Sequence, residues 1–179
     1  MKNPLIVAAG LAALALAACE QQSRHEGDTQ AAASKPETGE ARFQYSLSED
    51  ASGEYAPLET VLVGDWGLEH IFISGPHSFE RLDVESWGQA QAAPLTMVLS
   101  SANGGLTVAP ARFEISDSRV RFEGSSPATG DYRFEGRMDL DALAKARRTL
   151  GSEEAVLNGK LRIGGQTFNN LSFKIKTGG

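Results

Sequence analysis

The amino-acid sequence predicts a mainly β fold: an antiparallel β-sandwich or a partly open barrel of about nine or ten strands, with one α-helix at about 139–150. From residue 42 onward, apolar and polar residues alternate with the period of two that is typical of half-buried strands. Clusters of Gly, Ser, Asp and Asn divide this part of the chain into short segments. Only one segment has helical periodicity, so a parallel α/β fold is disfavoured.

The first expected strand begins at Phe43. In "RFQYSLS", the side chains of Phe43, Tyr45 and Leu47 share one face, and Gln44 and Ser46 share the other. The block "EDASGEY" is expected to turn the chain. Further strands are expected at 58–63, 68–73, 81–87 and 95–100, and the turn signals "GDWG", "SGPHS" and "SANGG" separate them.

An Arg-Phe-Glu tripeptide occurs three times, at 112–114, 121–123 and 133–135. In a strand, each phenylalanine would point inward, and each arginine and glutamate outward. Cross-strand pairs of opposite charge would then contribute about 0.2–1 kcal/mol each. The segment "ISDSRV" is short enough for a tight hairpin between the first two tripeptides. We interpret the charged positions as a solvated sheet exterior, with a charged docking face as the alternative.

One helix is expected in "MDLDALAKARRTLGS". Asp139 can cap its N-terminus, and Gly151 can end it after Arg147 and Arg148, which suit the negative C-terminal end. The side expected to face the core consists of Leu140, Leu143, Ala144 and Leu150.

A β-hairpin is expected to close the domain, because the strand segments 156–163 and 167–176 flank two glycines at 164 and 165. Asn169 and Asn170 are expected to mark a bulge in the second strand. The inward side chains of this hairpin are expected to be Leu157, Leu161, Ile163, Phe173 and Ile175.

The N-terminus has the layout of a secretory signal: Lys2 precedes an apolar stretch at 5–16. This stretch is shorter than the about 20 apolar residues that a membrane-spanning helix needs, so we interpret it as a targeting signal. Leu16-Ala17-Ala18-Cys19 resembles, at all four positions, the lipobox of bacterial lipoproteins. The resemblance implies cleavage before Cys19, a diacylglycerol thioether on its sulfur and an acylated amine. The alternative is ordinary cleavage at the A-x-A pattern of residues 15–17.

Three parts of the chain are therefore expected: a lipoprotein signal peptide at 1–18, a disordered tether at 19–41, and a single β-rich domain at 42–177. The tether contains no large apolar residue, and as a coil it would hold its ends about 25 Å apart. Glu20 follows the cysteine at the position where the inner-membrane retention signals of some Gram-negative lipoproteins have aspartate, so the resemblance to lipoproteins implies the outer membrane. The domain would face the periplasm or the cell surface.

Composition and motifs exclude several functions. The formal charge is −6, and no cluster of Lys and Arg stands out along the chain, so nucleic acid is not an expected partner. The sequence contains no G-x-S-x-G or H-E-x-x-H motif, no calcium loop and no second cysteine. We therefore expect no catalytic residues, no enzymatic activity and no cofactor.

Two groups of residues are candidates for a site. In "GDWGLEHIFISGPHSFE", His70 and His77 could converge on a divalent metal if residues 68–79 form a hairpin; the simpler interpretation is that no metal is bound. Trp66 and Trp87, each before a glycine, could line a ligand groove, and the alternative is that they plug the two ends of a sandwich.

Three functions from different classes follow from these residues. The first is a noncatalytic, membrane-anchored envelope lipoprotein that binds an envelope partner, whether protein, glycan or peptidoglycan. The second is a carrier of lipid or another small ligand in a half-open barrel. The third is a metal-dependent hydrolase built around His70. The first is preferred, because catalytic motifs are absent and a long tether suits the capture of a partner.

Overall fold

The computed structural model describes residues 43–80 and 93–177 of the chain. In these residues, eleven strands form one sheet in the order β1-β7-β8-β9-β10-β11-β2-β4-β5-β6, and β3 pairs with β4 beside this path. The strands are β1 (Phe43–Ser46), β2 (Gly53–Pro57), β3 (Leu62–Val63), β4 (Trp66–Ile73), β5 (Leu95–Ser101), β6 (Gly104–Val108), β7 (Arg112–Ser116), β8 (Arg119–Ser126), β9 (Gly130–Met138), β10 (Leu157–Ile163) and β11 (Gln166–Ile175).

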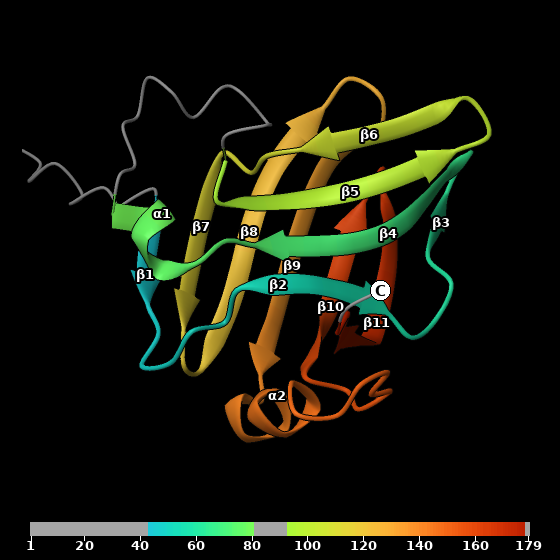
Figure 1. The fold of residues 1–179 in the computed structure, drawn as a ribbon. Helices are drawn as coiled ribbons and strands as arrows, with labels where there is room; N and C mark the ends of the chain where they lie inside the picture. Colours follow the sequence, from blue (N-terminus) through green and yellow to red (C-terminus); the bar gives the residue numbers. More distant parts are fainter. Residues whose placement is uncertain (1–42, 81–92, 178–179) are drawn as a thin grey trace, which may run out of the picture. The chain divides into compact units, whose positions relative to one another are not determined.

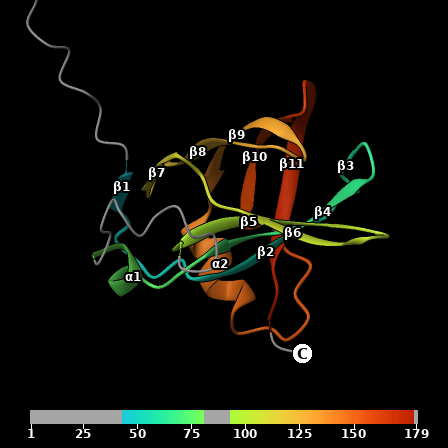
Figure 2. The same ribbon diagram turned by 90° about the horizontal axis from the view of Figure 1, so that it is seen from above.

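The sheet curls into a half-barrel, which confirms the predicted mainly β fold in its partly open barrel form. Figures 1 and 2 show that β2, β4, β5 and β6 cross the inner side of β7–β11. All strand pairs are antiparallel except one: β1 pairs parallel with β7, and Phe43 lies opposite Phe113. The signal peptide, Cys19, the tether, the strand expected at 81–87 and Trp87 lie outside the described residues.

The core lies between these two parts of the sheet. The three phenylalanines of the Arg-Phe-Glu tripeptides all point inward as predicted, and they are neighbours, because Phe113 pairs with Phe122 and Phe122 with Phe134. The ring of Phe134 stacks on Phe122 at 5.2 Å and meets Phe173 edge-on at 5.6 Å. Tyr55 is also fully buried. Aromatic and aliphatic side chains of the chain itself therefore pack together in the core of the half-barrel.

Two glycines make room for the ring of Phe134. A Cβ atom at Gly136 would lie 2.7 Å from its Cζ atom, and a Cβ atom at Gly159 would lie 2.6 Å from the same atom. The two glycines are paired across β9 and β10. The ring thus covers a part of the sheet where no other side chain fits.

The closing hairpin follows the prediction. β10 and β11 are joined by Gly164 and Gly165, whose φ angles of 56° and 80° favour glycine. The pairing shifts between Gly159 and Leu161 of β10, opposite the expected bulge, where Asn170 has a φ of 57°. All five side chains expected to point inward from this hairpin are buried.

Two expected segments near the N-terminal end of the domain are wrong. Residues 53–57, which belonged partly to an expected turn, form β2, because Tyr55 is fully buried and its hydroxyl donates to the Ala51 carbonyl oxygen. Within the strand expected at 58–63, only Leu62 and Val63 pair with β4. Leu58, directly after Pro57, is 40% exposed. Apolar character alone did not make this segment a strand.

Helix α2 (Leu140–Ala146) confirms the predicted helix and its cap. Asp139 Oδ1 accepts a hydrogen bond of 2.9 Å from the Ala142 backbone amide. The helix ends earlier than expected, at Ala146, and Leu150 is 83% exposed instead of facing the core. Beyond Ala146 the chain continues toward Gly151 in turns. One of them is closed by a hydrogen bond from the Thr149 backbone amide to the Ala146 carbonyl oxygen.

A second, unexpected helix, α1 (Pro76–Glu80), replaces the turn predicted at "SGPHS". Proline is favoured at a first helical position, because its nitrogen has no hydrogen to leave unpaired. The helix places the Phe79 ring 4.1 Å from that of Tyr45 and 5.5 Å from that of Phe113. It thus packs an aromatic side chain against the β1–β7 edge of the core.

Arg147, at the C-terminal end of α2, connects this helix to the loop between β1 and β2. Its Nη1 atom donates to the Asp50 carbonyl oxygen and its Nη2 atom to that of Ser52, each at 2.5 Å. We expect Arg147→Gln to lower the free energy of unfolding by about 1–2 kcal/mol, because two charge-assisted hydrogen bonds are lost. Urea unfolding measures the change. Arg148→Gln is the control, and an equal effect of both substitutions would contradict the proposed contact.

Candidate binding face

The outer side of β7–β10 collects charged side chains from four neighbouring strands. We call this surface the basic face and define it by the outward-pointing residues of these strands. Its seven cations and four carboxylates are Arg112, Arg119, Arg121, Arg133, Arg137, Lys160, Arg162, Glu114, Glu123, Asp131 and Glu135. The face therefore carries an excess of three positive charges in a chain whose formal charge is −6.

Strand register brings opposite charges together in its centre. Glu123 on β8 lies between Arg112 on β7 and Arg133 on β9, its partners in the two ladders. Its carboxylate is 3.8 Å from Arg112 Nη1 and 3.6 Å from Arg133 Nη1. Glu135 lies 3.6 Å from Arg121 Nε and 2.6 Å from Arg133 Nη2. The predicted pairing of opposite charges on the wet side of the sheet is therefore present.

The hydrogen bond between Arg133 and Glu135 has an electrostatic consequence. It lowers the pKa of the Glu135 carboxyl and raises that of the Arg133 guanidinium. Both side chains are about half exposed, so the pair is screened by water and contributes little to stability. Its effect is to hold the guanidinium in place on the surface.

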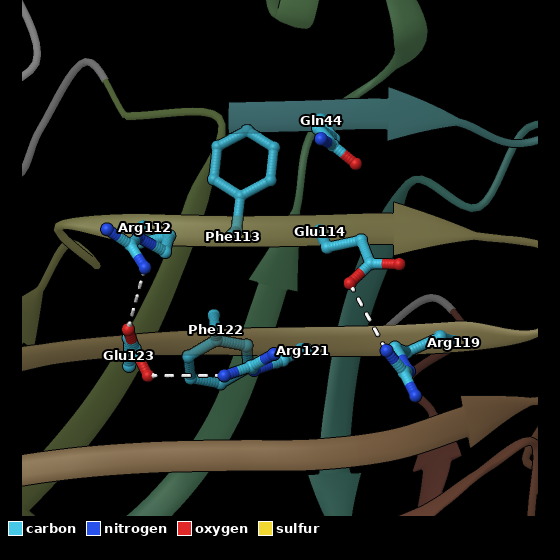
Figure 3. A pocket seen from close by; sticks show the side chains of 8 residues that line it. All are labelled: Gln44, Arg112, Phe113, Glu114, Arg119, Arg121, Phe122 and Glu123. Atoms are coloured by element: carbon cyan, nitrogen blue, oxygen red, sulfur yellow. Dashed lines mark ion pairs between the residues drawn. The ribbon is translucent and has the colours of Figure 1, made fainter. Parts of the chain in front are cut away.

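Shallow hollows lie between these side chains. Figure 3 shows one of about 220 Å³ between β1, β7 and β8, where Arg119 Nη1 is 3.5 Å from Glu114 Oε2. A second, of about 530 Å³, is lined by three arginines, Arg112, Arg133 and Arg162. Its acidic lining residues are Glu123 and Asp131. Arginine guanidinium groups around an open hollow are suited to phosphate or carboxylate groups.

Three cations of the basic face, Arg137, Lys160 and Arg162, have no carboxylate within 4.0 Å among residues 43–80 and 93–177. All three are exposed. Arg162 also lies directly opposite Arg133 in the β9–β10 pair. Arg133 is paired with Glu123 and Glu135, so the positive charge that no described carboxylate neutralises is that of Arg137, Lys160 and Arg162.

This cluster was not predicted from the sequence. No run of Lys and Arg stands out there, because the cations of the face are up to 50 residues apart in the chain and only the pairing of four strands gathers them. The expectation that nucleic acid is not a partner stays a prediction. The available signal was the alternation in β9 and β10, which turns Arg137, Lys160 and Arg162 outward.

The two candidate histidines lie in different surroundings. His70 lies on β4, its side chain is 14% exposed, and its Nε2 atom is 3.9 Å from Glu54. His77 lies on α1, its side chain is 89% exposed, and its Nδ1 atom is 3.3 Å from Glu80. No hairpin joins them, because β4 pairs with β2 and β5. Within the described part of the chain, no group of three or more His, Cys, Asp or Glu side chains could hold a metal ion.

His70 belongs to a polar cluster that spans three strands. Lys176, just after β11, has its Nζ atom 3.2 Å from His70 Nδ1 and 3.0 Å from Glu54 Oε2 on β2. Burial, followed by the charge of Lys176, lowers the pKa of His70, although Glu54 and Glu69 act in the opposite direction. The unprotonated ring can accept a hydrogen bond from the Lys176 ammonium group, and a protonated ring cannot.

This cluster predicts a pH dependence of stability. Because the pKa of His70 is lower in the folded protein than its value of 6.5 in an unfolded chain, the unfolded state takes up a proton first. The free energy of unfolding is therefore expected to fall as pH drops below 6.5 and to level off below the folded pKa. Urea unfolding between about pH 8 and pH 5 measures it. His70→Gln should reduce this slope and His77→Gln should keep it; the reverse would contradict the assignment.

Of the two candidate groove tryptophans, the structure describes Trp66. It begins β4, pairs with Val63 and packs, partly buried, against the core. It does not line either of the two hollows of the basic face. Whether Trp87 shares a groove with it stays a prediction.

No helix within residues 43–80 and 93–177 is long and apolar enough to cross a membrane. In comparisons with known proteins, no family model, no curated protein and no solved structure matches the chain.

Proposed function

We propose that the chain is a membrane-anchored envelope lipoprotein whose noncatalytic β-domain binds an anionic component of the envelope through the basic face. The observation that carries the proposal is the excess of cations on β7–β10, in an otherwise acidic protein. The lipobox-like Leu16-Ala17-Ala18-Cys19 supports the anchor and the location, with the outer membrane implied by Glu20. Acidic protein segments, anionic glycans and lipid headgroups share the chemistry that this face would recognise.

The packing of the interior favours a surface binder over a carrier. A lipid carrier needs room inside the half-barrel, whereas here the buried ring of Phe134 contacts the buried rings of Phe122 and Phe173. Tyr55 is also fully buried, and its hydroxyl donates to the Ala51 carbonyl oxygen. A ligand would have to displace these side chains, at the cost of their packing.

Site-specific crosslinking in intact cells tests the proposal. A photoreactive residue replaces Lys160 on the basic face, or Lys145 on α2 as the control, in the full chain. Lys145 is exposed as well, but it pairs with Glu154 away from the face. We expect adducts of envelope components from position 160 and few from 145. Equal yields from both positions, or none from 160, would contradict the proposed function.

A further inference from the structure

The charges of the domain are divided between two parts of the sheet. The described residues up to 110, which form β1–β6 and α1, contain seven carboxylates and no Lys or Arg. The basic face, by contrast, has an excess of three positive charges. Figure 2 shows β2, β4, β5 and β6 on one side and β7–β11 on the other. The outer side of β7–β10 would therefore be attracted to a negatively charged surface, while the opposite layer would be repelled by it.

The described domain begins beside this face. Phe43 is the first described residue and begins β1, whose strand partner is β7, the border of the basic face. Twenty-three residues separate it from Cys19. If these residues form the predicted disordered tether, their r.m.s. end-to-end distance is about 25–30 Å, which keeps an anchored domain close to the membrane on average. The membrane surface is then present at a high effective concentration.

The uncompensated cations lie on the strands farther from β1. Lys160 and Arg162 project from β10, and Arg162 opposes Arg133 across the ladder. Both β10 cations are exposed, and neither has a carboxylate partner among the described residues. Arg162 lines the hollow of about 530 Å³ together with Arg133, whose charge is already paired with Glu123 and Glu135, so an anion in this hollow would have Arg162 as a cation without a carboxylate partner among the described residues.

We propose that the basic face docks on anionic lipid headgroups of the membrane that carries the anchor, and that Lys160 and Arg162 contact their phosphate groups. This inference rests on the proposed function and names its partner. It is favoured over an acidic protein because the face is an open sheet surface with shallow hollows and the tether keeps the membrane within reach. The acidic β2–β6 layer then faces away from the membrane.

Vesicle binding tests the inference. The chain from residue 19 with Cys19→Ala, which removes the predicted signal and the anchor, is floated with vesicles of phosphatidylcholine alone or of equal parts phosphatidylcholine and phosphatidylglycerol. We expect binding to the anionic vesicles only, with a partition coefficient that falls as salt is added. Each interfacial cation contributes about a fivefold factor, so Lys160→Gln with Arg162→Gln should lower the coefficient roughly thirtyfold.

The matched control is Lys145→Gln with Arg148→Gln, which removes the same amount of positive charge from the α2 region. We expect it to lower the partition coefficient only about twofold, through the change in net charge. Circular dichroism verifies that both double variants are folded. Equal losses in the two variants, or no binding of the parent chain to anionic vesicles, would overturn the inference. Tighter binding of soluble poly-glutamate than of vesicles would also overturn it, in favour of an acidic polypeptide.

The two proposals fail in different ways. If vesicles do not bind but position 160 still forms adducts with an envelope protein or glycan in cells, the proposed function stands and the lipid assignment falls. If position 160 forms no adducts and the vesicles do not bind, both fall.

Discussion

Replacing Phe134 by alanine is expected to lower the free energy of unfolding by about 3–5 kcal/mol. The ring is fully buried, stacks on Phe122 and meets Phe173 edge-on. It also covers Gly136 and Gly159, so its removal leaves a cavity that no neighbouring side chain on those two positions can fill. Urea unfolding followed by circular dichroism measures the loss, which is a large part of the stability of a domain of this size.

Phe168→Ala is the matched control, because the same atoms are removed from a side chain that is only partly buried at the edge of the core. We expect a clearly smaller loss for it. A loss at Phe134 no greater than that at Phe168 would mean that the interior repacks around the missing ring. In that case the interior could deform at little cost to admit a ligand, and the preference for a surface binder would weaken.

Replacing Cys19 by serine is expected to move the protein from the membrane fraction to the soluble fraction of the cell. The sulfur that would carry diacylglycerol is lost, and its two acyl chains are lost with it. Each methylene that they bury in the bilayer would contribute about 0.8 kcal/mol to membrane binding. Mass spectrometry of the mature N-terminus of the parent chain should show an acylated cysteine. An unmodified N-terminus at residue 18, 19 or 20 would contradict lipidation.

Ala15→Leu distinguishes the two processing routes. It destroys the A-x-A pattern at residues 15–17 but leaves the lipobox-like residues 16–19 unchanged. If the chain is processed as a lipoprotein, the variant is still cut and acylated at Cys19. If ordinary signal peptidase cuts it, the precursor accumulates instead.

Features that depend on neighbouring residues could be predicted from the sequence. The inward direction of Phe113, Phe122 and Phe134 follows from alternation along each strand. The cap at Asp139 and the turn at Gly164 and Gly165 follow from the local chemistry of those residues. Each of these needs no knowledge of which strands are neighbours.

Features that depend on strand order could not be predicted in the same way. Nothing local indicates that β1 pairs with β7, about 70 residues later, or that β10 lies beside β9 with Arg162 opposite Arg133. The basic face exists only through that order, and so the sequence analysis did not find it. The error at residues 58–61 has another cause, because an apolar segment forms a strand only where a partner edge is free to pair with it.

The parallel pairing of β1 determines how the domain would bear mechanical load. If the domain is tethered as predicted, a pull from the anchor enters through Phe43, at the start of a strand of four residues whose strand neighbour is β7. Besides its pairing with β7, β1 is held by the stacking of Tyr45 on Phe79 and by the contact of Phe43 with Phe113. These contacts are few beside the ladders of β8–β10, so under force β1 would detach first. The tether would then lengthen by at least the four residues of β1, while the pairing of β7–β11 that carries the basic face remained intact.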